Sequence, residues 1–195
     1  MKFSKTSFLW KTLHRTLGER MRDDLSNKLV HLTKGTSDDI DGNRGEALNT
    51  LTKIMISKQL KGGTGFIKGG HKCVCFSEAP ISKLSYIIAK KGQNDFKYHP
   101  YGVIVDKSWL YEKGGRPVIY GPDEDYKKLP DDLKYRHVRF ELSKTSNIDH
   151  TWEREWRIQE EALDITDQDV TLVVPDREVK SALVNRYAGR WHYMY

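Results

Sequence analysis

The stretch WEREWRI at residues 152–158 carries the densest information in this chain. In an extended strand, successive side chains point to opposite faces of the sheet. This alternation predicts that Glu153, Glu155 and Arg157 share one face, while the tryptophans, the isoleucine and Arg154 occupy the other. The apolar side chains would anchor the strand, and rigidly held carboxylates are typical of a functional site. The alternative is a surface strand whose Glu and Arg side chains only neutralise each other.

The segments around this stretch predict an α+β fold. Apolar residues at the helical period predict helices over residues 47–60, 81–90 and 176–187. Short apolar runs predict strands over residues 28–33, 73–76, 103–105, 118–120, 153–158 and 170–174. Because strands and helices do not alternate regularly, we expect a mixed or antiparallel sheet with flanking helices.

The length of 195 residues favours a single domain over residues 1–195. Residues 1–27 have apolar positions near the helical period, so we expect an N-terminal helical segment that packs on the core, with a loose arm as the alternative. The chain has no apolar run of membrane-spanning length and no signal-peptide pattern at its start. These features indicate a cytoplasmic protein with no membrane partner.

The charge balance favours a polyanionic partner. The chain has 33 Lys and Arg residues against 27 Asp and Glu residues, a net charge of +6. Residues 53–72 contain several lysines and no acidic residue, whereas acidic residues gather at 123–132 and 160–169. Lys61 and Lys68 are therefore candidates for contacts with nucleic acid. The alternative is that these lysines serve only solubility.

Several catalytic and metal motifs are missing from the sequence. The two cysteines, Cys73 and Cys75, would share a strand face, where a disulfide between them has poor geometry. The histidines and cysteines lack metal-ligand spacing, so we expect no metal. The glycines of residues 62–70 lack the spacing of a phosphate-binding loop.

Three further side chains have both a functional and a structural interpretation. His31 and Thr33 would share one face of their strand, where they could contact ribose hydroxyls or be satisfied within the core. Tyr120 precedes a Gly-Pro turn, and its ring could stack on a planar ligand or cap the core.

The order of these segments resembles the ADP-ribosyltransferase fold, and within it the DarT-like group that modifies nucleic acid. The resemblance is carried by HLT at residues 31–33, CVCFSEAP at 73–80, a following helix with Tyr86, and Glu153-Arg154-Glu155. That family has a histidine on its first core strand, a middle strand followed by a helix with aromatic residues, and a catalytic glutamate on a late strand.

The chain also resembles uncharacterised proteins of bacterial phage-defence loci, through its HLTKG, CFSEAP and EREWR segments. One such group has been labelled an abortive-infection antitoxin, which would be a protein partner and not an enzyme.

The transferase resemblance implies NAD as co-substrate and cleavage of its nicotinamide glycosidic bond through an oxocarbenium-like state. It implies that Glu155 is the catalytic carboxylate, and that Glu153 orients the acceptor. The implied NAD contacts are a ribose at His31 with help from Thr33, and a nicotinamide ring stacked on Tyr86 or Tyr120. Arg157 would bind pyrophosphate or pair with Glu155. Arg44 is the candidate for the acceptor-side arginine of the family.

Two hypotheses follow. The first is an NAD-dependent ADP-ribosyltransferase that acts on nucleic acid, or less favourably on protein, as a toxin or phage-defence effector; a neutralising antitoxin would then be a partner. It requires His31 and Glu155 to border one cleft. The second is a non-enzymatic nucleic-acid-binding or antitoxin-type partner protein, in which the glutamates and arginines of residues 153–157 form a structural ion network.

Overall fold

A computed structural model gives the fold of residues 26–35, 40–65, 67–78, 99–187 and 190–195, with side chains from residue 44 onward in the second range. Residues 1–25 of the predicted N-terminal helical segment and the predicted helix over residues 81–90, with Tyr86, lie outside these ranges. In the described part, no helix has the length and apolar character needed to cross a bilayer.

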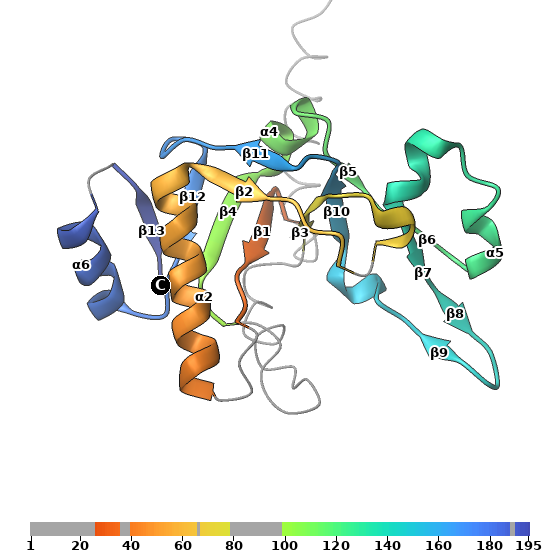
Figure 1. Cartoon of the computed structure of the whole chain (residues 1–195), viewed down its shortest axis with the longest axis horizontal. Coiled ribbons are helices and arrows are strands. Elements are labelled where there is room, and N and C mark those ends of the chain that lie inside the picture. The colour runs from red at the N-terminus through yellow and green to blue at the C-terminus, as the bar shows by residue number, and fades with distance from the viewer. Residues whose placement is uncertain (1–25, 36–39, 66, 79–98, 188–189) are drawn as a thin grey trace, which may run out of the picture.

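The centre of the fold is a seven-stranded sheet in the order β13-β12-β4-β1-β3-β10-β5 (Figure 1). Its strands are β1 (Lys28–Leu32), β3 (Val74–Ser77), β4 (Gly102–Asp106), β5 (Arg116–Pro117), β10 (Glu155–Ile158), β12 (Val170–Val173) and β13 (His192–Met194). Neighbouring strands are antiparallel except β12 and β13, which are parallel. The prediction of an α+β fold with a mixed sheet and flanking helices is confirmed.

Three two-stranded ladders surround the main sheet. They pair β2 (Gln59–Lys61) with β11 (Ala162–Asp164), β6 (Ile119–Gly121) with β7 (His137–Arg139), and β8 (Glu141–Leu142) with β9 (Asn147–Ile148). The helices are α2 (Ile40–Ser57), α4 (Lys107–Glu112), α5 (Asp123–Tyr126) and α6 (Arg177–Arg186), with short 3-10 turns η1 (Lys68–Gly70), η3 (Asp131–Arg136) and η4 (Thr151–Glu153). Strands β6 to β9 and helix α5 extend beyond the β5 edge of the sheet (Figure 1).

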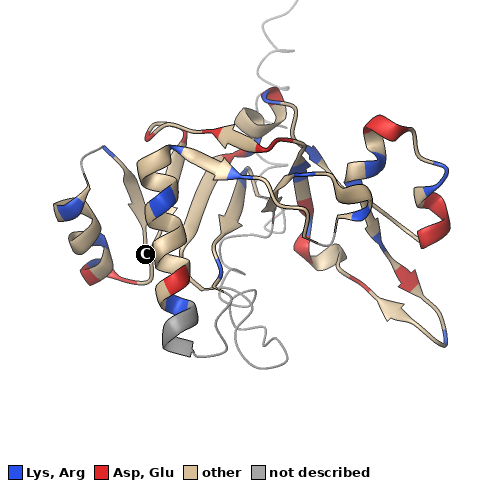
Figure 2. Cartoon of the chain, viewed as in Figure 1, with Lys and Arg blue, Asp and Glu red and all other residues tan. Residues whose placement is uncertain are grey.

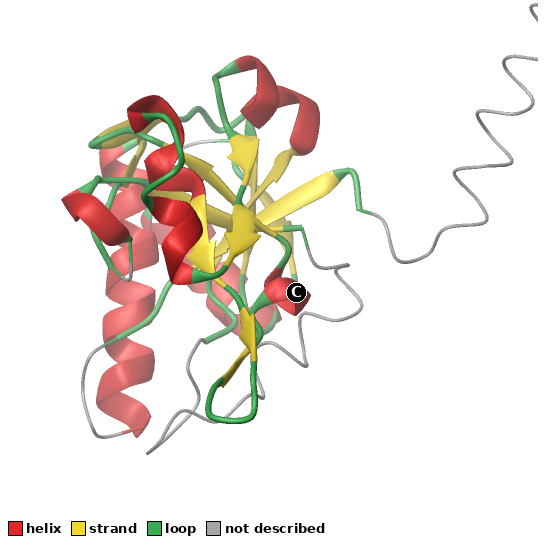
Figure 3. Cartoon of the chain, turned by 90° about the vertical axis from the view of Figure 1, so that its right-hand side faces the viewer, coloured by secondary structure: helices red, strands yellow, loops and turns green. Residues whose placement is uncertain are grey.

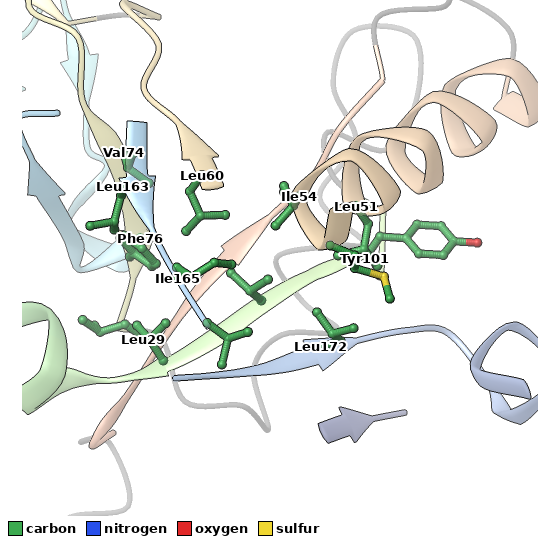
Figure 4. Close-up of a cluster of buried hydrophobic side chains, with 14 of the residues drawn as sticks. Leu29, Leu51, Ile54, Leu60, Val74, Phe76, Tyr101, Leu163, Ile165 and Leu172 are labelled. Atoms are coloured by element: carbon green, nitrogen blue, oxygen red, sulfur yellow. The ribbon is translucent and has the colours of Figure 1, made fainter. Parts of the chain in front are cut away.

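The main core lies between one face of the sheet and α2. Helix α2 contributes Ala47, Leu51, Ile54 and Met55 to a buried cluster with side chains of the central strands (Figure 4). With the molecule turned by 90°, α2 lies to one side of the strands (Figure 3). The opposite face buries a smaller cluster of Val30, Ile104 and Val173. The two clusters therefore identify the face to which each strand residue points.

Most predicted elements are present with shifted ends. Helix α2 begins at Ile40 and ends at Ser57, because Lys58 has a positive φ of 53° and the chain then enters β2. Leu60 is consequently a strand residue. The predicted strand over residues 118–120 corresponds to β6, which begins at Ile119, and Val118 lies between β5 and β6. The predicted helix over residues 176–187 matches α6, where the Asp176 side chain accepts a 2.9 Å hydrogen bond from the Val179 amide as an N-cap.

Strand β4 approaches β1 closely enough to require glycine at position 102. A Cβ atom added to Gly102 would lie 2.2 Å from the carbonyl oxygen of His31. At Gly63, an added Cβ would have no heavy atom within 4 Å. We expect Gly102→Ala to lower the free energy of unfolding by about 1–3 kcal/mol, because backbone must shift to accept the methyl group. Urea denaturation checks this, with Gly63→Ala as the control; equal effects of the two substitutions would contradict the close approach.

Candidate functional site

The WEREWRI stretch is not a continuous strand. Residues 151–153 form the 3-10 turn η4, and Arg154 adopts a left-handed conformation with φ 46°. Two hydrogen bonds from the end of β3 and the residue after it hold this turn: the Ser77 hydroxyl donates to the Glu153 carbonyl at 2.6 Å, and the Glu78 amide donates to the Arg154 carbonyl at 3.1 Å. The predicted strand over residues 153–158 is therefore wrong at its first two positions. Alternation applies from Glu155 onward, so it does not place Glu153 beside Glu155.

Within β10, the side chains alternate between the two faces of the sheet as predicted. Trp156 and Ile158 belong to the main core, on the α2 face. Glu155 and Arg157 point to the opposite face, where they lie across from Ser77 and Cys75 of β3 in register.

Glu155 and Arg157 form a two-bond ion pair that is largely withdrawn from solvent. Arg157 donates from Nε to Glu155 Oε1 at 2.8 Å and from Nη2 to Oε2 at 3.1 Å. Its Nη1 donates to the carbonyls of Tyr135 at 2.8 Å and His137 at 3.2 Å. The side chains are 6% and 15% exposed for Arg157 and Glu155, respectively. This burial excludes the alternative of a solvated surface pair. A charge buried to this extent requires its oppositely charged partner.

The two cysteines lie near this pair. Burial raises the pKa of the Cys73 thiol to about 11, with opposing smaller effects of Arg157 and Glu155. Burial also raises the pKa of the Cys75 thiol, and the nearby Glu155 carboxylate raises it further. Both are free thiols. Since the thiolate is the reactive form, the raised pKa values make both thiols weak nucleophiles at neutral pH.

Tyr120 touches the site through its hydroxyl group. The hydroxyl oxygen accepts from the Glu155 amide at 3.2 Å, and the hydroxyl donates to the His150 carbonyl at 3.2 Å. Burial raises the pKa of this phenol. Tyr120 therefore lies beside Glu155, where it fixes the start of β10.

His31 lies on the other face of the sheet. Its neighbour Val30 pairs with Ser77, which also pairs with Glu155, so Val30 and Glu155 share a face and His31 points away from it. The imidazole lies 5.7 Å from the Phe76 ring, centroid to centroid, and its Nδ1 is 2.8 Å from the Cys75 carbonyl oxygen. Burial lowers the pKa of His31, and the hydrogen bond to the carbonyl partly offsets this. His31 and Glu155 therefore do not border one cleft within the described structure.

The other candidate residues are spread over separate places. Thr33 is buried, and its hydroxyl lies 2.9 Å from the Ala47 carbonyl oxygen and 3.1 Å from that of Tyr101. Arg44 is exposed on α2 and contacts the Tyr101 hydroxyl at 3.3 Å. Lys61 donates to the Gln59 side chain at 2.9 Å, and Lys68 forms an ion pair with Asp123.

The α2 face holds a polar cluster that the sequence pattern did not single out. Glu78 follows β3 directly, and its carboxylate accepts from the Trp156 indole at 2.8 Å and from the Lys107 ammonium at 2.6 Å. The Glu78 side chain is only 12% exposed. The signal available in the sequence was a carboxylate placed directly after a buried apolar strand. The cluster clamps Trp156 on one face, while Arg157 holds Glu155 on the other.

The arrangement can present a fixed carboxylate. Glu155 is oriented by two hydrogen bonds from Arg157, its amide is held by Tyr120, and its carbonyl accepts from the Val118 amide at 3.0 Å. A carboxylate that does not need to reorganise is suited to stabilising positive charge as it develops on a substrate. Among the described residues, no group of three or more His, Cys, Asp or Glu side chains is arranged to hold a metal ion.

Comparisons of the chain with protein-family models, with curated proteins and with solved structures find no match.

The chain offers a matched test of the buried pair. Arg139 and Glu141 form another Arg–Glu pair two residues apart, with Arg139 42% exposed. We expect Arg157→Met to lower the free energy of unfolding by about 3–5 kcal/mol, because Glu155 and two carbonyls lose their donor. Arg139→Met should cost about 1 kcal/mol or less. Chemical denaturation measures both, and similar costs at the two positions would show that the Arg157 pair is not structural.

Burial of His31 predicts a pH dependence of stability. Because the folded protein has a His31 pKa below 6.5, the unfolded chain binds this proton first as the pH falls. Stability should therefore decline below about pH 6.5, by at most about 1.4 kcal/mol per pH unit, until the folded-state pKa is reached. Urea midpoints at pH 7.5 and 5.5 should differ less in His31→Gln than in the wild type. His192→Gln, on the exposed side of β13, is the control; an unchanged pH difference in His31→Gln would contradict the assignment.

Proposed function

We propose that this protein is an NAD-dependent ADP-ribosyltransferase that modifies nucleic acid, as a toxin or phage-defence effector. Protein is the less favoured acceptor. The proposal takes Glu155 as the carboxylate that acts on the nicotinamide ribose, and it takes the Glu155 face of strands β3 and β10 as the place of reaction.

The supporting observation is the adjacency of the three strands that carry the family resemblance. Strand β1 holds the histidine, β3 precedes the segment with Tyr86, and β10 begins with Glu155; these strands are consecutive neighbours in the sheet. Residues from distant parts of the sequence thereby come together at Ser77 and Glu155. Arg157 holds the carboxylate in one orientation.

The proposed reaction uses a carboxylate in that position. The bond between the ribose C1′ and the nicotinamide nitrogen breaks, and nicotinamide leaves with the bonding electrons. Glu155 stabilises the positive charge that develops on the ribose and accepts a hydrogen bond from a ribose hydroxyl. A nucleophilic atom of the acceptor then bonds to C1′ and loses its proton to solvent. Glu153, in the preceding turn η4, is assigned to orienting the acceptor.

The geometry changes the role proposed for His31. Its side chain points away from Glu155, so the proposal gives His31 no contact with the same ribose. Thr33 is likewise engaged with backbone carbonyls in the interior. The Tyr120 hydroxyl contacts the Glu155 amide and the His150 carbonyl, so these contacts hold backbone.

A second candidate function is a non-enzymatic nucleic-acid-binding or antitoxin-type partner protein. The observation that favours it is that Glu155 and His31 both have their polar partners within the fold. Both Glu155 oxygens accept from Arg157, and His31 packs on Phe76 with a ring nitrogen at a backbone carbonyl. In this case the ion pair stabilises the fold and the binding of nucleic acid does not depend on NAD.

One labelling experiment separates the two functions. The purified chain is incubated with NAD labelled in its adenylate phosphate, together with single-stranded DNA, RNA or protein, and nicotinamide release is measured in parallel. We expect label on a nucleic-acid pool and a fall in nicotinamide release of about 100-fold or more in Glu155→Gln, the usual scale for loss of a group that stabilises transition-state charge.

Two further variants make the experiment interpretable. Glu155→Asp keeps a carboxylate for Arg157 but withdraws it by one methylene, so it should fold and still lose most of the rate. Glu161→Gln removes an exposed carboxylate that pairs with Lys72, and should leave the rate unchanged. Undiminished nicotinamide release from Glu155→Gln would refute the role of Glu155. Salt-sensitive nucleic-acid binding by a wild type that releases no nicotinamide would support the second function.

A further inference from the structure

We propose that α6 and β13 form a binding surface for single-stranded nucleic acid. The surface consists of Arg177, Lys180, Arg186, Tyr187, Tyr193 and Tyr195, and we call it the cation–tyrosine surface. It lies at the β13 edge of the sheet, five strand-to-strand steps from β10 (Figure 1). At about 4.8 Å per step, it is roughly 24 Å from Glu155.

The positive charges of this surface lie against tyrosine rings. Lys180 Nζ is 5.2 Å from the centroid of the Tyr195 ring and 5.9 Å from that of Tyr193. Arg177 Cζ is 5.5 Å from the Tyr195 centroid. Arg186 Cζ, near the end of the same helix, is 5.7 Å from the ring of Tyr187. Contact with a ring orients a cation without cancelling its charge.

These cations differ from several other cations of the described chain, which are held in ion pairs. Lys28 pairs with Asp106 at 2.6 Å, Lys72 with Glu161 at 2.8 Å and Lys128 with Asp125 at 2.8 Å. Over the described ranges, no carboxylate lies in ion-pair distance of the three cations of α6. Figure 2 shows the basic positions on α6 at one end of the molecule. Their charge is therefore available to phosphate groups.

Two carboxylates beside the surface, Asp176 and Glu178, lower its net positive charge but form no ion pair with the three cations. The Asp176 side chain is used as the N-cap of α6, where it accepts from the Val179 amide. Within α6 itself, the sequence contains three cations and one carboxylate, that of Glu178.

The tyrosines favour a single strand over a duplex. Tyr195 is 54% exposed, so part of its ring is open to a stacked base. Tyr193 is partly buried and packs against the main core. Bases can stack on protein rings when they are unpaired, whereas in a duplex they are stacked on one another. An exposed ring beside cations that are outside ion pairs is an arrangement suited to single-stranded nucleic acid.

This inference goes beyond the proposed function, because it assigns the place where nucleic acid is held and does not require NAD turnover. Binding is measured without NAD, so its failure is distinguishable from failure of the transferase reaction.

The test measures fluorescence anisotropy of labelled dT15 with the full chain over a range of salt concentrations. The triple variant Arg177→Gln/Lys180→Gln/Arg186→Gln should bind at least about tenfold more weakly at low salt and reduce the salt slope by about 2, the value for three lost phosphate contacts on a single strand. Tyr195→Leu should weaken binding by about fivefold or more through loss of stacking.

The matched control removes the same amount of charge from paired positions. Lys28→Gln/Lys72→Gln/Lys128→Gln lowers the net charge equally and should change the affinity by less than about threefold. Equal losses in the two triple variants would overturn the proposal, because they would show a general effect of net charge. Wild-type affinity in the Arg177/Lys180/Arg186 variant, no binding of dT15 by the wild type, or equal binding of a 15-base-pair duplex would also overturn it.

Discussion

The buried ion pair between Glu155 and Arg157 is the interaction on which the rest of the structure depends. A guanidinium group in the interior requires acceptors for its donors, and Arg157 finds them in both Glu155 oxygens and in the carbonyls of Tyr135 and His137. These last two residues belong to the segment that extends beyond the β5 edge of the sheet. One side chain thereby joins that segment to the central sheet and fixes the direction of a carboxylate. Stability and any chemistry of Glu155 are consequently coupled.

The second constraint is the separation of the two sheet faces. On the α2 face, Glu78, Lys107 and Trp156 form a polar cluster beside the main core. On the opposite face, Glu155 lies near Ser77 and the two protonated thiols. Because side chains alternate, a shift of one residue in β1 would bring His31 to the Glu155 face, but Gly102 and the full ladder to β4 hold the register. The proposed chemistry therefore rests on Glu155 and not on a Glu155–His31 pair.

The sequence was sufficient to predict the features of the fold that depend on local apolar periodicity. The apolar alternation of residues 155–158 predicted which face Glu155 and Arg157 share, and helical spacing located most of α2 and α6. The turn before Glu155 could not be predicted this way, because contacts from Ser77 and Glu78 help to hold Arg154 in its left-handed conformation. Likewise, the lysines of residues 53–72 looked like a basic cluster, yet Lys68 and Lys72 pair with acids that lie far along the chain. Charge that is segregated in sequence can be paired in space.

The central claim is that Glu155 and Arg157 act as one coupled unit that fixes the carboxylate. A double-mutant cycle measures this directly, from the free energies of unfolding of the wild type, Glu155→Gln, Arg157→Met and the double variant. The structure predicts a coupling free energy of about 2 kcal/mol or more, because each single substitution leaves a buried polar group without its partner. Additive effects, within about 0.5 kcal/mol, would contradict the claim.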